Sequence, residues 1–545
     1  MCPETPRTQS DGLQTPDAEA SRPPRRAAWR YLLFLLVVVL VAGYVNFRTS
    51  KIPGDDAYYH MRHASVYASL GPFFNDFPWV VYSVVGKFAA DTWYGFHLLL
   101  VPFAYVADPL MQIKLASVFL LTVLLLLIWW ALRRLGVARP CLWPFVVLFV
   151  APDALYRLLL MRPHMLSTGL LLLLLSLLTC GGALTVGLTC LALTFFHLNL
   201  FWLIPVIVGV WAAAARLAGG NLQPAKVGAA LAGGVVGWLL RPNPIGAAKI
   251  LYVQLFTLTQ VKLAGMPLAF GRELEPLAPI RLALNFTFLL LLWAGAVCVY
   301  VACLHVRRDK LDRRLLTFMW SSLAMSLLFF VMTNLISRRT ADLWNAFAIA
   351  FVAGVYTCAF AGQPKGDSLW PRPRTRKAFA VAGVALLVLM ACFTLLLNSR
   401  VMDQEPPAFR LGLAGAWLRD NAREGAIVFN VHWDDFPQLF YLAPYSRYIG
   451  GMDPIFQYAF SHDLYWKAHH LAGGKDAAST CGAPQCSTQQ LEDTYTVLRR
   501  DFHASYIVFD KTLDAGLYDY VSTDKRFAIR IEVPRLVLAE LVGPD

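Results

Sequence analysis

Charged residues are scarce in this chain. Only 15% of its 545 residues are charged, whereas 57% are hydrophobic, and its mean hydropathy is +0.51. This balance excludes an ordinary soluble domain and is typical of a polytopic membrane protein. The sequence also lacks heptads and any repeat of solenoid period, which excludes coiled-coil and repeat architectures.

Long uncharged apolar runs are abundant instead. A helix needs roughly 17–25 apolar residues to cross a bilayer, and five runs approach or exceed this length: 115–132, 282–304, 315–337, 343–361 and 378–399. Weaker runs lie at 141–155, 165–180, 183–196, 198–215 and 227–240. Together with the first run, at 31–47, they predict about eleven transmembrane helices.

The net charge of +13 is unevenly distributed. From residue 401 onward, 13 basic residues face 19 acidic ones, so the first 400 residues carry the whole basic excess. That excess lies in short loops on one side of the predicted spans, which the positive-inside rule places in the cytoplasm. The basic pattern therefore reports topology and not nucleic-acid binding. Mixed acidic, basic and imidazole groups collect on the opposite face, which we expect to be extracytoplasmic, at an inner or plasma membrane.

Three regions follow from this pattern. Residues 1–28 are rich in proline, serine, threonine and arginine and are predicted to form a disordered cytoplasmic segment. Residues 29–400 are predicted to form a transmembrane catalytic domain, and 401–545 an extracytoplasmic (periplasmic) mixed α/β domain. In this last region we expect one helix and three strands: Phe409–Asn421, Ala426–Asn430, Ser505–Asp510 and Phe527–Ala539.

Most of the ten cysteines lie in apolar runs, where they act as small hydrophobic residues. Cys481 and Cys486 are different, because they lie in a glycine- and proline-containing loop of the predicted exported domain. An oxidising compartment favours a disulfide between them, although two free thiols remain the alternative.

The strongest candidate site follows the first apolar run, where Asp55 and Asp56 lie close to a membrane face. Ionisable groups in such a place are candidates for function. A helix N-terminal cap is the simpler alternative, but a cap explains only one of the two carboxylates. His60 lies four residues after Asp56 on the same helical face. A carboxylate and an imidazole at this spacing can bind a divalent metal or orient a general base.

Basic residues of the outer face are candidate phosphate ligands. Arg162 and His164 flank Pro163 at the end of a run, where snorkelling of the arginine is the alternative. Arg338 and Arg339 lie on the outer face against the positive-inside rule, so they call for an anionic partner. That partner is a donor phosphate or, alternatively, lipid headgroups.

The long outer loop 241–280 begins at Arg241 and carries Glu273 and Glu275 near its end. Long ordered loops of this kind tend to be functional, so one glutamate could supply a further carboxylate to the outer site. The alternative is a local surface pair with Arg272, which stabilises little.

An aromatic and acidic group follows the predicted strand that ends at Asn430. Trp433, Asp434 and Asp435 lie where open α/β sheets place their binding sites. An aromatic ring can stack on a sugar face, and carboxylates can accept hydrogen bonds from its hydroxyls. This group therefore suits sugar or acceptor recognition, and an ordinary acidic turn is the alternative.

These features together resemble the GT-C glycosyltransferases, and within them the catalytic subunits of oligosaccharyltransferases. The first outer loop of that family carries an aspartate motif leading into Tyr-Tyr-His, and this chain has Asp55-Asp56-Ala57-Tyr58-Tyr59-His60. The C-terminal Trp-Trp-Asp-Tyr-Gly motif of the family is echoed by the segment from His432 to Phe436. The first match is fairly specific and the second is loose.

The resemblance implies roles for several residues. The long-loop glutamate of the family corresponds to Glu273 or Glu275, and its phosphate-binding arginine to Arg338 or Arg339. Asp55 or Asp56 would then act on the acceptor. The residues expected to bind substrate are Tyr59, Arg162, Arg241, Arg338, Arg339, Trp433, Asp434 and Asp435.

The family also implies a divalent cation, Mg²⁺ or Mn²⁺, for which the candidate ligands here are Asp56, His60 and His164. The chain departs from the family at this point. A second acidic motif is expected after the third span, but the sequence reads Met161-Arg162-Pro163-His164. An acidic ligand is therefore missing unless His164 replaces it.

We therefore expect an integral membrane glycosyltransferase. It would move a sugar or oligosaccharide from a polyprenyl-phosphate or -pyrophosphate carrier to an extracytoplasmic protein, lipid or glycan acceptor. Relatives of the same fold that use a monosaccharide on polyprenyl phosphate, such as aminoarabinose and mannosyl transferases, stay open as models. Two alternatives come from other classes: a transporter or flippase of lipid-linked sugars, and a non-catalytic membrane assembly protein.

Overall fold

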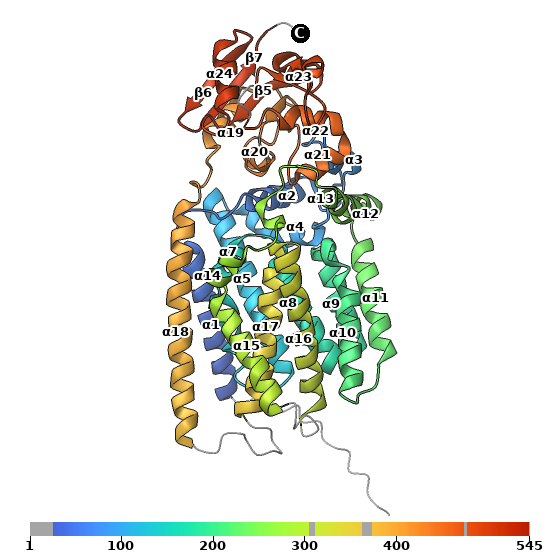
Figure 1. Cartoon of the computed structure of the whole chain (residues 1–545), viewed down its shortest axis with the longest axis vertical. Coiled ribbons are helices and arrows are strands. Elements are labelled where there is room, and N and C mark those ends of the chain that lie inside the picture. The colour runs from blue at the N-terminus through green and yellow to red at the C-terminus, as the bar shows by residue number, and fades with distance from the viewer. Residues whose placement is uncertain (1–24, 305–310, 362–372, 474–476, 544–545) are drawn as a thin grey trace, which may run out of the picture.

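The computed structural model describes residues 25–304, 311–361, 373–473 and 477–543. Figure 1 shows a bundle of long helices below and a smaller, sheet-containing part above it. The predicted class, a polytopic helical protein with a small C-terminal α/β domain, is confirmed. Of the segment predicted to be disordered, residues 1–24 lie outside the described residues and residues 25–28 begin the first helix.

The helices of the bundle are α1 (Arg25–Phe47), α5 (Pro109–Arg134), α6 (Trp143–Phe149), α7 (Pro152–Leu159), α8 (His164–Cys180), α9 (Ala183–Phe196), α10 (Leu203–Leu217), α11 (Pro224–Leu239), α14 (Pro279–Asn285), α15 (Thr287–Val299), α16 (Arg313–Leu335), α17 (Ala341–Tyr356) and α18 (Pro373–Gln404). Shorter helices cover its upper end: α2 (Asp56–Leu70), α3 (Val84–Phe88), α4 (Tyr94–Leu100), α12 (Pro244–Tyr252) and α13 (Leu258–Leu263).

Among the described residues, six helices are long and apolar enough to cross a membrane, or up to eight if each of two bent pairs is one span. The predicted spans at 183–196 and 227–240 form α9 and α11, which are only 14 and 16 residues long. The run 141–155 does not form one helix. Helix α6 ends before α7 begins at Pro152, whose ring and missing N–H interrupt a helix.

The bent pairs shape the upper end of the bundle. The chain bends by 112° between α7 and α8, across the residues 160–163, and by 84° between α14 and α15. Pro163 precedes the first residue of α8, and a proline disfavours helical backbone in the residue before it. The break leaves Arg162 between two helix ends and outside both helices.

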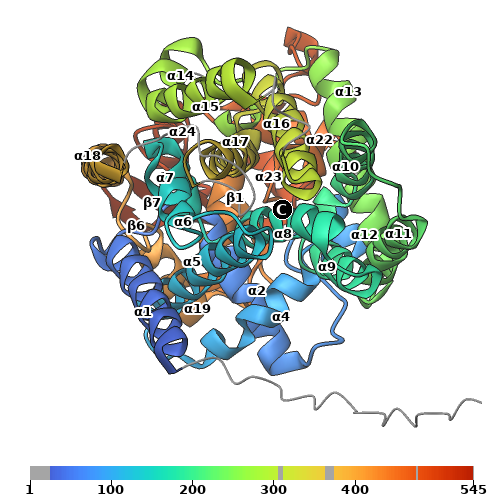
Figure 2. The same cartoon turned by 90° about the horizontal axis from the view of Figure 1, so that it is seen from below.

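Helix α17 lies inside the bundle and α18 at its rim, as Figure 2 shows from below. In the most apolar stretch of the span Arg338–Ala359, which contains α17, 94% of the residues are buried within the molecule. The corresponding share for the span Val381–Gln404 of α18 is 17%. Packing around α17 therefore forms the centre of the membrane domain.

The C-terminal part is built on a five-stranded sheet of order β2-β1-β5-β7-β6. Strands β2 (Arg447–Tyr448), β1 (Ile427–Asn430) and β5 (Ala504–Phe509) are parallel, and β7 (Leu536–Leu541) runs antiparallel to β5 and to β6 (Phe527–Val533). The single strand expected at 527–539 is thus a hairpin. A second, two-stranded sheet pairs β3 (Ser479–Thr480) with β4 (Glu492–Asp493). Helices α19 (Gly412–Asn421), α20 (Phe436–Leu442), α21 (Pro454–Phe460), α22 (His462–His469), α23 (Thr494–Arg500) and α24 (Ala515–Thr523) surround these strands. Cys481 and Cys486 form the disulfide that the oxidising setting favoured.

The two parts share one hydrophobic core. Tyr59 and Phe77 from the upper end of the bundle pack against Phe436 and Phe440 of α20, whose rings are stacked 5.4 Å apart. The main chain of Trp79 also accepts a hydrogen bond from the nitrogen of Tyr448 in β2, at 2.8 Å. These contacts hold the C-terminal domain over the N-terminus of α2.

Candidate active site

A cavity of about 620 Å³ opens where the bundle meets the C-terminal domain. Its volume is in the range of small-molecule sites. Segments far apart in the sequence line it, and its charged side chains are both basic and acidic. The basic ones are Arg157, Arg162, Arg272, Arg281 and Arg338, and the acidic ones are Asp55, Asp56, Asp153, Glu273, Glu405 and Asp434.

The start of α2 brings Asp55 and Asp56 to this cavity. Gly54 precedes them with φ of +67°, and a Cβ there would lie 3.0 Å from a methyl group of Leu160, so the tight approach requires glycine. Asp55 occupies the N-cap position of α2 but makes no capping hydrogen bond through its side chain. Helix capping therefore does not account for this carboxylate, which lines the cavity instead.

Arg162 bridges two of the predicted carboxylates. Its Nε forms a close ion pair with Asp56, and its Nη1 donates to Glu273 Oε2 at 2.6 Å. The break between α7 and α8 allows this reach, because it turns residue 162 towards the cavity. One guanidinium therefore joins an acid at the start of α2 and an acid of the loop 241–280.

Glu273 is the centre of a larger ion-pair cluster. Its Oε1 pairs closely with Arg339, and its Oε2 lies 3.6 Å from Arg157 Nη1. Arg157 is held in turn by Asp342 through three hydrogen bonds of 2.7–2.9 Å. Burial by itself would raise the pKa of Glu273, but the guanidinium groups of Arg162, Arg339 and Arg157 hold it far below its usual range. Glu273 therefore stays ionised at any physiological pH.

Asp55 has a different environment. Its Oδ2 lies 3.5 Å from Arg410, whose other nitrogen pairs with Asp435 at 2.6 Å. Burial raises the pKa of Asp55 to about 7, and the neighbouring acids Asp434, Asp435 and Asp56 add to the rise while Arg410 opposes it. A carboxylate with a pKa near neutrality suits a general base.

Three cavity arginines keep their guanidinium groups available. Within the described part of the chain, the side chains of Arg272, Arg281 and Arg338 make no hydrogen bond or ion pair. Arg338 is anchored through its main-chain nitrogen, which donates to the carbonyl of Glu275 at 2.9 Å. Unpaired guanidinium groups beside a cavity form a site for phosphate oxygens.

The structure places the remaining predicted residues as follows. Glu275 is exposed, and its carboxylate does not line the cavity. Arg241 lies elsewhere and donates to the carbonyls of Trp238, Asp91 and Thr194. His164 also does not line the cavity, and its Nε2 lies 3.0 Å from the carbonyl of Arg157.

Tyr59 and His60 are buried in an aromatic cluster beneath α20. His60 Nδ1 lies 2.8 Å from His97 Nε2, and His97 Nδ1 lies 2.6 Å from Asp91 Oδ2. Burial, with the neighbouring His97, keeps the pKa of His60 well below its usual value, so its ring is neutral. Neither residue lines the cavity, because α2 turns this face towards the protein interior.

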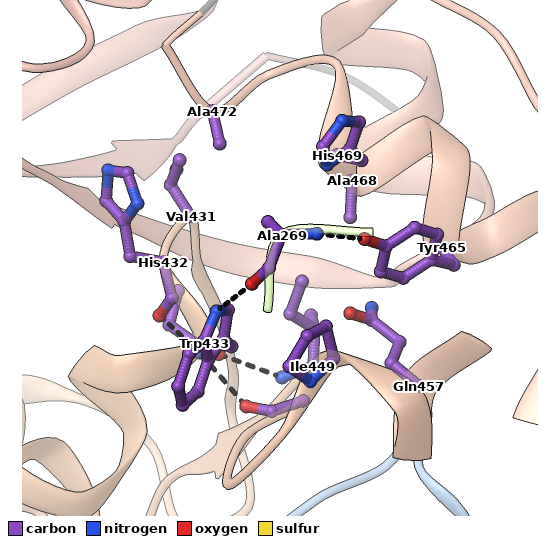
Figure 3. Close-up of a pocket in the computed structure, with 13 residues that line it drawn as sticks. Ala269, Val431, His432, Trp433, Ile449, Gln457, Tyr465, Ala468, His469 and Ala472 are labelled. Carbon is purple, nitrogen blue, oxygen red and sulfur yellow. Dashed lines mark hydrogen bonds between the residues drawn. The ribbon is translucent and has the colours of Figure 1, made fainter. Parts of the chain in front are cut away.

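Trp433 lies between the large cavity and a smaller pocket of about 80 Å³ in the C-terminal domain. Figure 3 shows its indole nitrogen donating to the carbonyl of Ala269. The main-chain nitrogen of Ala269 donates in turn to the Tyr465 hydroxyl. His432 also lines the smaller pocket and pairs with Asp514 at 2.8 Å. The predicted aromatic and acidic group therefore contributes to both hollows, with Asp434 on the large one.

Sequence reasoning missed several cavity residues. Asp153 and Tyr156 are three residues apart on α7, and Tyr156 donates to Glu405 at 2.8 Å. Their common helical face was a usable signal. Arg281 had no such signal, and neither had Arg410, which does not line the cavity but pairs with Asp55. Each is an isolated arginine in a segment without a motif.

Asp56 and Glu273 do not fit a divalent metal. Asp56 and both oxygens of Glu273 already pair with guanidinium groups. In the part of the chain that the structure describes, two other groups bring potential metal ligands together: His63 with Asp91 and His97, and His470 with Cys481 and Cys486. The first is buried outside the cavity, and in the second the sulfurs form the disulfide.

No protein-family model matches the sequence, and no curated protein matches it. Solved structures of the same fold do. Archaeal oligosaccharyltransferase AglB from Archaeoglobus fulgidus, in complex with an inhibitory peptide and a dolichol-phosphate, is 14% identical with a TM-score of 0.58 over 92% of this chain and 73% of its own. ArnT from Cupriavidus metallidurans, bound to undecaprenyl phosphate, is 14% identical with a TM-score of 0.55 over 95% of this chain and 100% of its own.

Arabinofuranosyltransferase AftD from Mycobacteria, in a mutant form, is 13% identical with a TM-score of 0.51 over 96% of this chain and 42% of its own. All three are GT-C glycosyltransferases. The chain therefore has a distant GT-C-like fold, as the sequence resemblance predicted, and it is that of an integral membrane protein.

Proposed function

We propose that this GT-C-fold protein is a glycosyltransferase that moves a sugar or oligosaccharide from a polyprenyl-phosphate or -pyrophosphate carrier to an extracytoplasmic acceptor. One observation carries the proposal. Carboxylates from the start of α2 and from the loop 241–280 meet unpaired arginines at a single cavity, in a fold shared with AglB, ArnT and AftD.

The donor phosphate binds to the arginine side of the cavity. Among the described residues, the guanidinium groups of Arg338, Arg281 and Arg272 form no direct ion pair or hydrogen bond, although the charge of Asp153 attracts the first two. A guanidinium binds phosphate oxygens bidentately. The phospholipid carriers bound by AglB and ArnT support this choice of ligand. Arg339 has a different role, because Glu273 holds its side chain.

The acceptor is activated on the acidic side. Asp55 takes the proton of the acceptor hydroxyl or amide, and the freed electron pair forms the new bond to the anomeric carbon. The bond from that carbon to the phosphate oxygen breaks, and its electrons leave with the carrier phosphate. Arg338 and its neighbours stabilise the charge that develops there, which is a large source of rate in such sites.

The C-terminal domain selects the acceptor. Trp433 and Asp434 extend from this domain to the large cavity, and Trp433 also borders the smaller pocket of Figure 3. An acceptor chain can therefore lie with its reacting atom near Asp55 and its neighbouring groups along the indole. Tryptophan and a carboxylate suit a glycan face as well as a peptide.

Orientation follows from the charge pattern. The positive-inside rule places the basic loops in the cytoplasm, so we infer that the cavity and the C-terminal domain are extracytoplasmic. A flippase of lipid-linked sugars would instead place its ionisable groups near mid-span, whereas the charged residues of this cavity lie in loops and near helix ends.

Transfer and binding assays on the purified protein test this function. In liposomes that contain a polyprenyl-phosphate-linked sugar, Asp55→Asn should lose transfer by about 100-fold or more while undecaprenyl phosphate still binds. Arg338→Gln should weaken that binding. Asp420→Asn, a matched change of an exposed acid on α19, should leave both unchanged. Full turnover by Asp55→Asn and by Asp56→Asn would refute the catalytic assignment.

A further inference from the structure

The position of Arg162 has a consequence for the cation requirement of the reaction. The sequence resemblance implies a divalent metal held by acids from separate outer loops. In the structure, an acid at the start of α2 and an acid of the loop 241–280 meet instead at one guanidinium, which pairs with Asp56 and donates to Glu273 at 2.6 Å. A protein cation thus pairs with Asp56, the only carboxylate among the three candidate metal ligands, and with the carboxylate of the long loop.

The surroundings of Glu273 also oppose a metal ion. Its Oε1 pairs with Arg339, and its Oε2 lies 3.6 Å from Arg157 Nη1. A dication placed against Glu273 would meet three guanidinium charges at short range, and like charges repel strongly in a partly buried site. The Glu273 side chain is only 17% exposed, so water does little to screen that repulsion.

Too few oxygen ligands remain to build a metal site beside this cluster. Mg²⁺ requires near-octahedral oxygen coordination, usually from one or two carboxylates with water or phosphate. Asp55 is itself paired with Arg410 at 3.5 Å. Asp153 accepts a hydrogen bond from Asn285, and Glu405 accepts one from Tyr156. Among the described residues, these pairs leave Asp434 as the one cavity carboxylate without a hydrogen bond or ion pair. His164, the residue that could have replaced the missing acid, does not line the cavity.

We propose that Arg162 takes the place of the divalent cation, so that this chain transfers its sugar without a metal. Arg162 is a positioning residue. It fixes the positions of the Asp56 and Glu273 carboxylates relative to each other and supplies a permanent positive charge to the cavity. Unlike a metal, this charge cannot be removed by a chelator. The inference deepens the proposed function and rests on it for the transfer step alone, since the absence of metal binding can be measured without transfer.

Metal binding by the full-length protein gives the first test. After treatment with EDTA, the protein is titrated with Mn²⁺ and free Mn²⁺ is followed by electron paramagnetic resonance. We expect the isotherm of the unaltered protein to match that of Asp56→Asn, because no Mn²⁺ binds at this carboxylate. Stoichiometric Mn²⁺ binding that Asp56→Asn or Glu273→Gln abolishes would overturn the inference, whether or not transfer has been detected.

Chemical rescue gives the second test. Arg162→Gly should reduce transfer by about 100-fold, and millimolar guanidinium ion should restore at least a tenth of the lost rate, whereas Mg²⁺ and Mn²⁺ should not. Arg139→Gly is the matched control, because Arg139 is exposed and has φ of +52°, which glycine tolerates. It should keep full activity without guanidinium.

The results separate the two proposals. Unaltered protein that loses transfer in EDTA and regains it with Mg²⁺ or Mn²⁺ would refute the role of Arg162 but leave the glycosyltransferase proposal standing. Arg162→Lys guards against a folding defect, because it keeps a positive charge in the same loop. Its transfer should be weak but unaffected by EDTA, and a requirement for Mn²⁺ would again contradict the inference.

Discussion

The environment of Asp55 predicts how transfer depends on pH. Its pKa is raised to about 7, first by burial and then by neighbouring carboxylates. A general base works only when deprotonated, so kcat/KM for the acceptor should be constant above about pH 8 and fall as the pH decreases. The ionised fraction is about one tenth at pH 6 and about one hundredth at pH 5, so the rate should fall by the same factors.

A neighbouring acid provides the control for this assignment. Asp434 contributes to the raised pKa of Asp55 through its charge, so Asp434→Asn should move the midpoint of the profile to lower pH, by up to about half a unit. Asp55→Asn should abolish the pH-dependent rate. An aspartate with an ordinary pKa near 3.9 would leave the rate flat between pH 5 and 8. A flat profile, or a midpoint that rises in Asp434→Asn, would refute Asp55 as the base.

Four further predictions concern single features of the structure. Glu273→Gln leaves a guanidinium cluster without its central charge, so initial rates should fall by about 100-fold and the melting temperature should drop; wild-type rates would contradict this. Arg241→Gln removes hydrogen bonds to three carbonyls, so it should cost roughly 2–4 kcal/mol of stability in denaturant melts with an unchanged KM for the donor. Asp514 raises the pKa of His432 to about 9, so their pair stabilises the protein fully below about pH 6.5 and loses this effect as the pH rises through 9; the difference in melting temperature between wild type and His432→Gln should shrink over that interval. The double change Cys481→Ser with Cys486→Ser opens a short loop and should lower stability by about 2 kcal/mol, measured under oxidising and reducing conditions.

Local motifs identified residues that line the cavity where a backbone constraint marks them in the sequence. The adjacent carboxylates at 55 and 56 could be recognised because two acids exceed the need of one helix cap, and the structure places both on the cavity. Arg162 was marked by the proline that follows it, which breaks the helix there. In both cases a backbone constraint and an unexplained charge coincide within a few residues.

Pairs of neighbouring candidates could not be separated in the same way. Glu273 and Glu275 both lay near the end of the loop, but the short turn at Arg272–Leu274 buries Leu274 and directs only Glu273 to the cluster. Arg338 and Arg339 likewise share one turn, and only Arg339 pairs with Glu273. The conformation of one short turn determines which of two neighbouring side chains faces the cluster, and this conformation cannot be read from composition.

Other residues depend on tertiary packing alone. Arg241 looked like a ligand because it opens a long outer loop, yet its donors are satisfied by main-chain carbonyls. His60 shares a helical face with Asp56, but its ring is buried against Trp93, Phe96 and His97. A sequence cannot tell a guanidinium that faces a cavity from one that closes a helix end. The same holds for the predicted spans. The apolar run 141–155 looks continuous by composition, but α7 begins at Pro152 and the run forms two helices.

The order of the charges explains how one cavity can serve two substrates. The series of charges begins at Asp55 and its neighbour Asp56. Arg162 pairs with Asp56 and also with Glu273. Glu273 pairs in turn with Arg339, which is next to Arg338 in the sequence. The inner members of this series neutralise one another and are fixed by short contacts. Its two ends differ. Asp55 is a carboxylate of raised pKa with a single, longer contact to Arg410, and Arg338 carries a guanidinium without an ion pair among the described residues. Such a series keeps the base that deprotonates the acceptor apart from the cations that bind the phosphate, so neither quenches the other before substrates arrive.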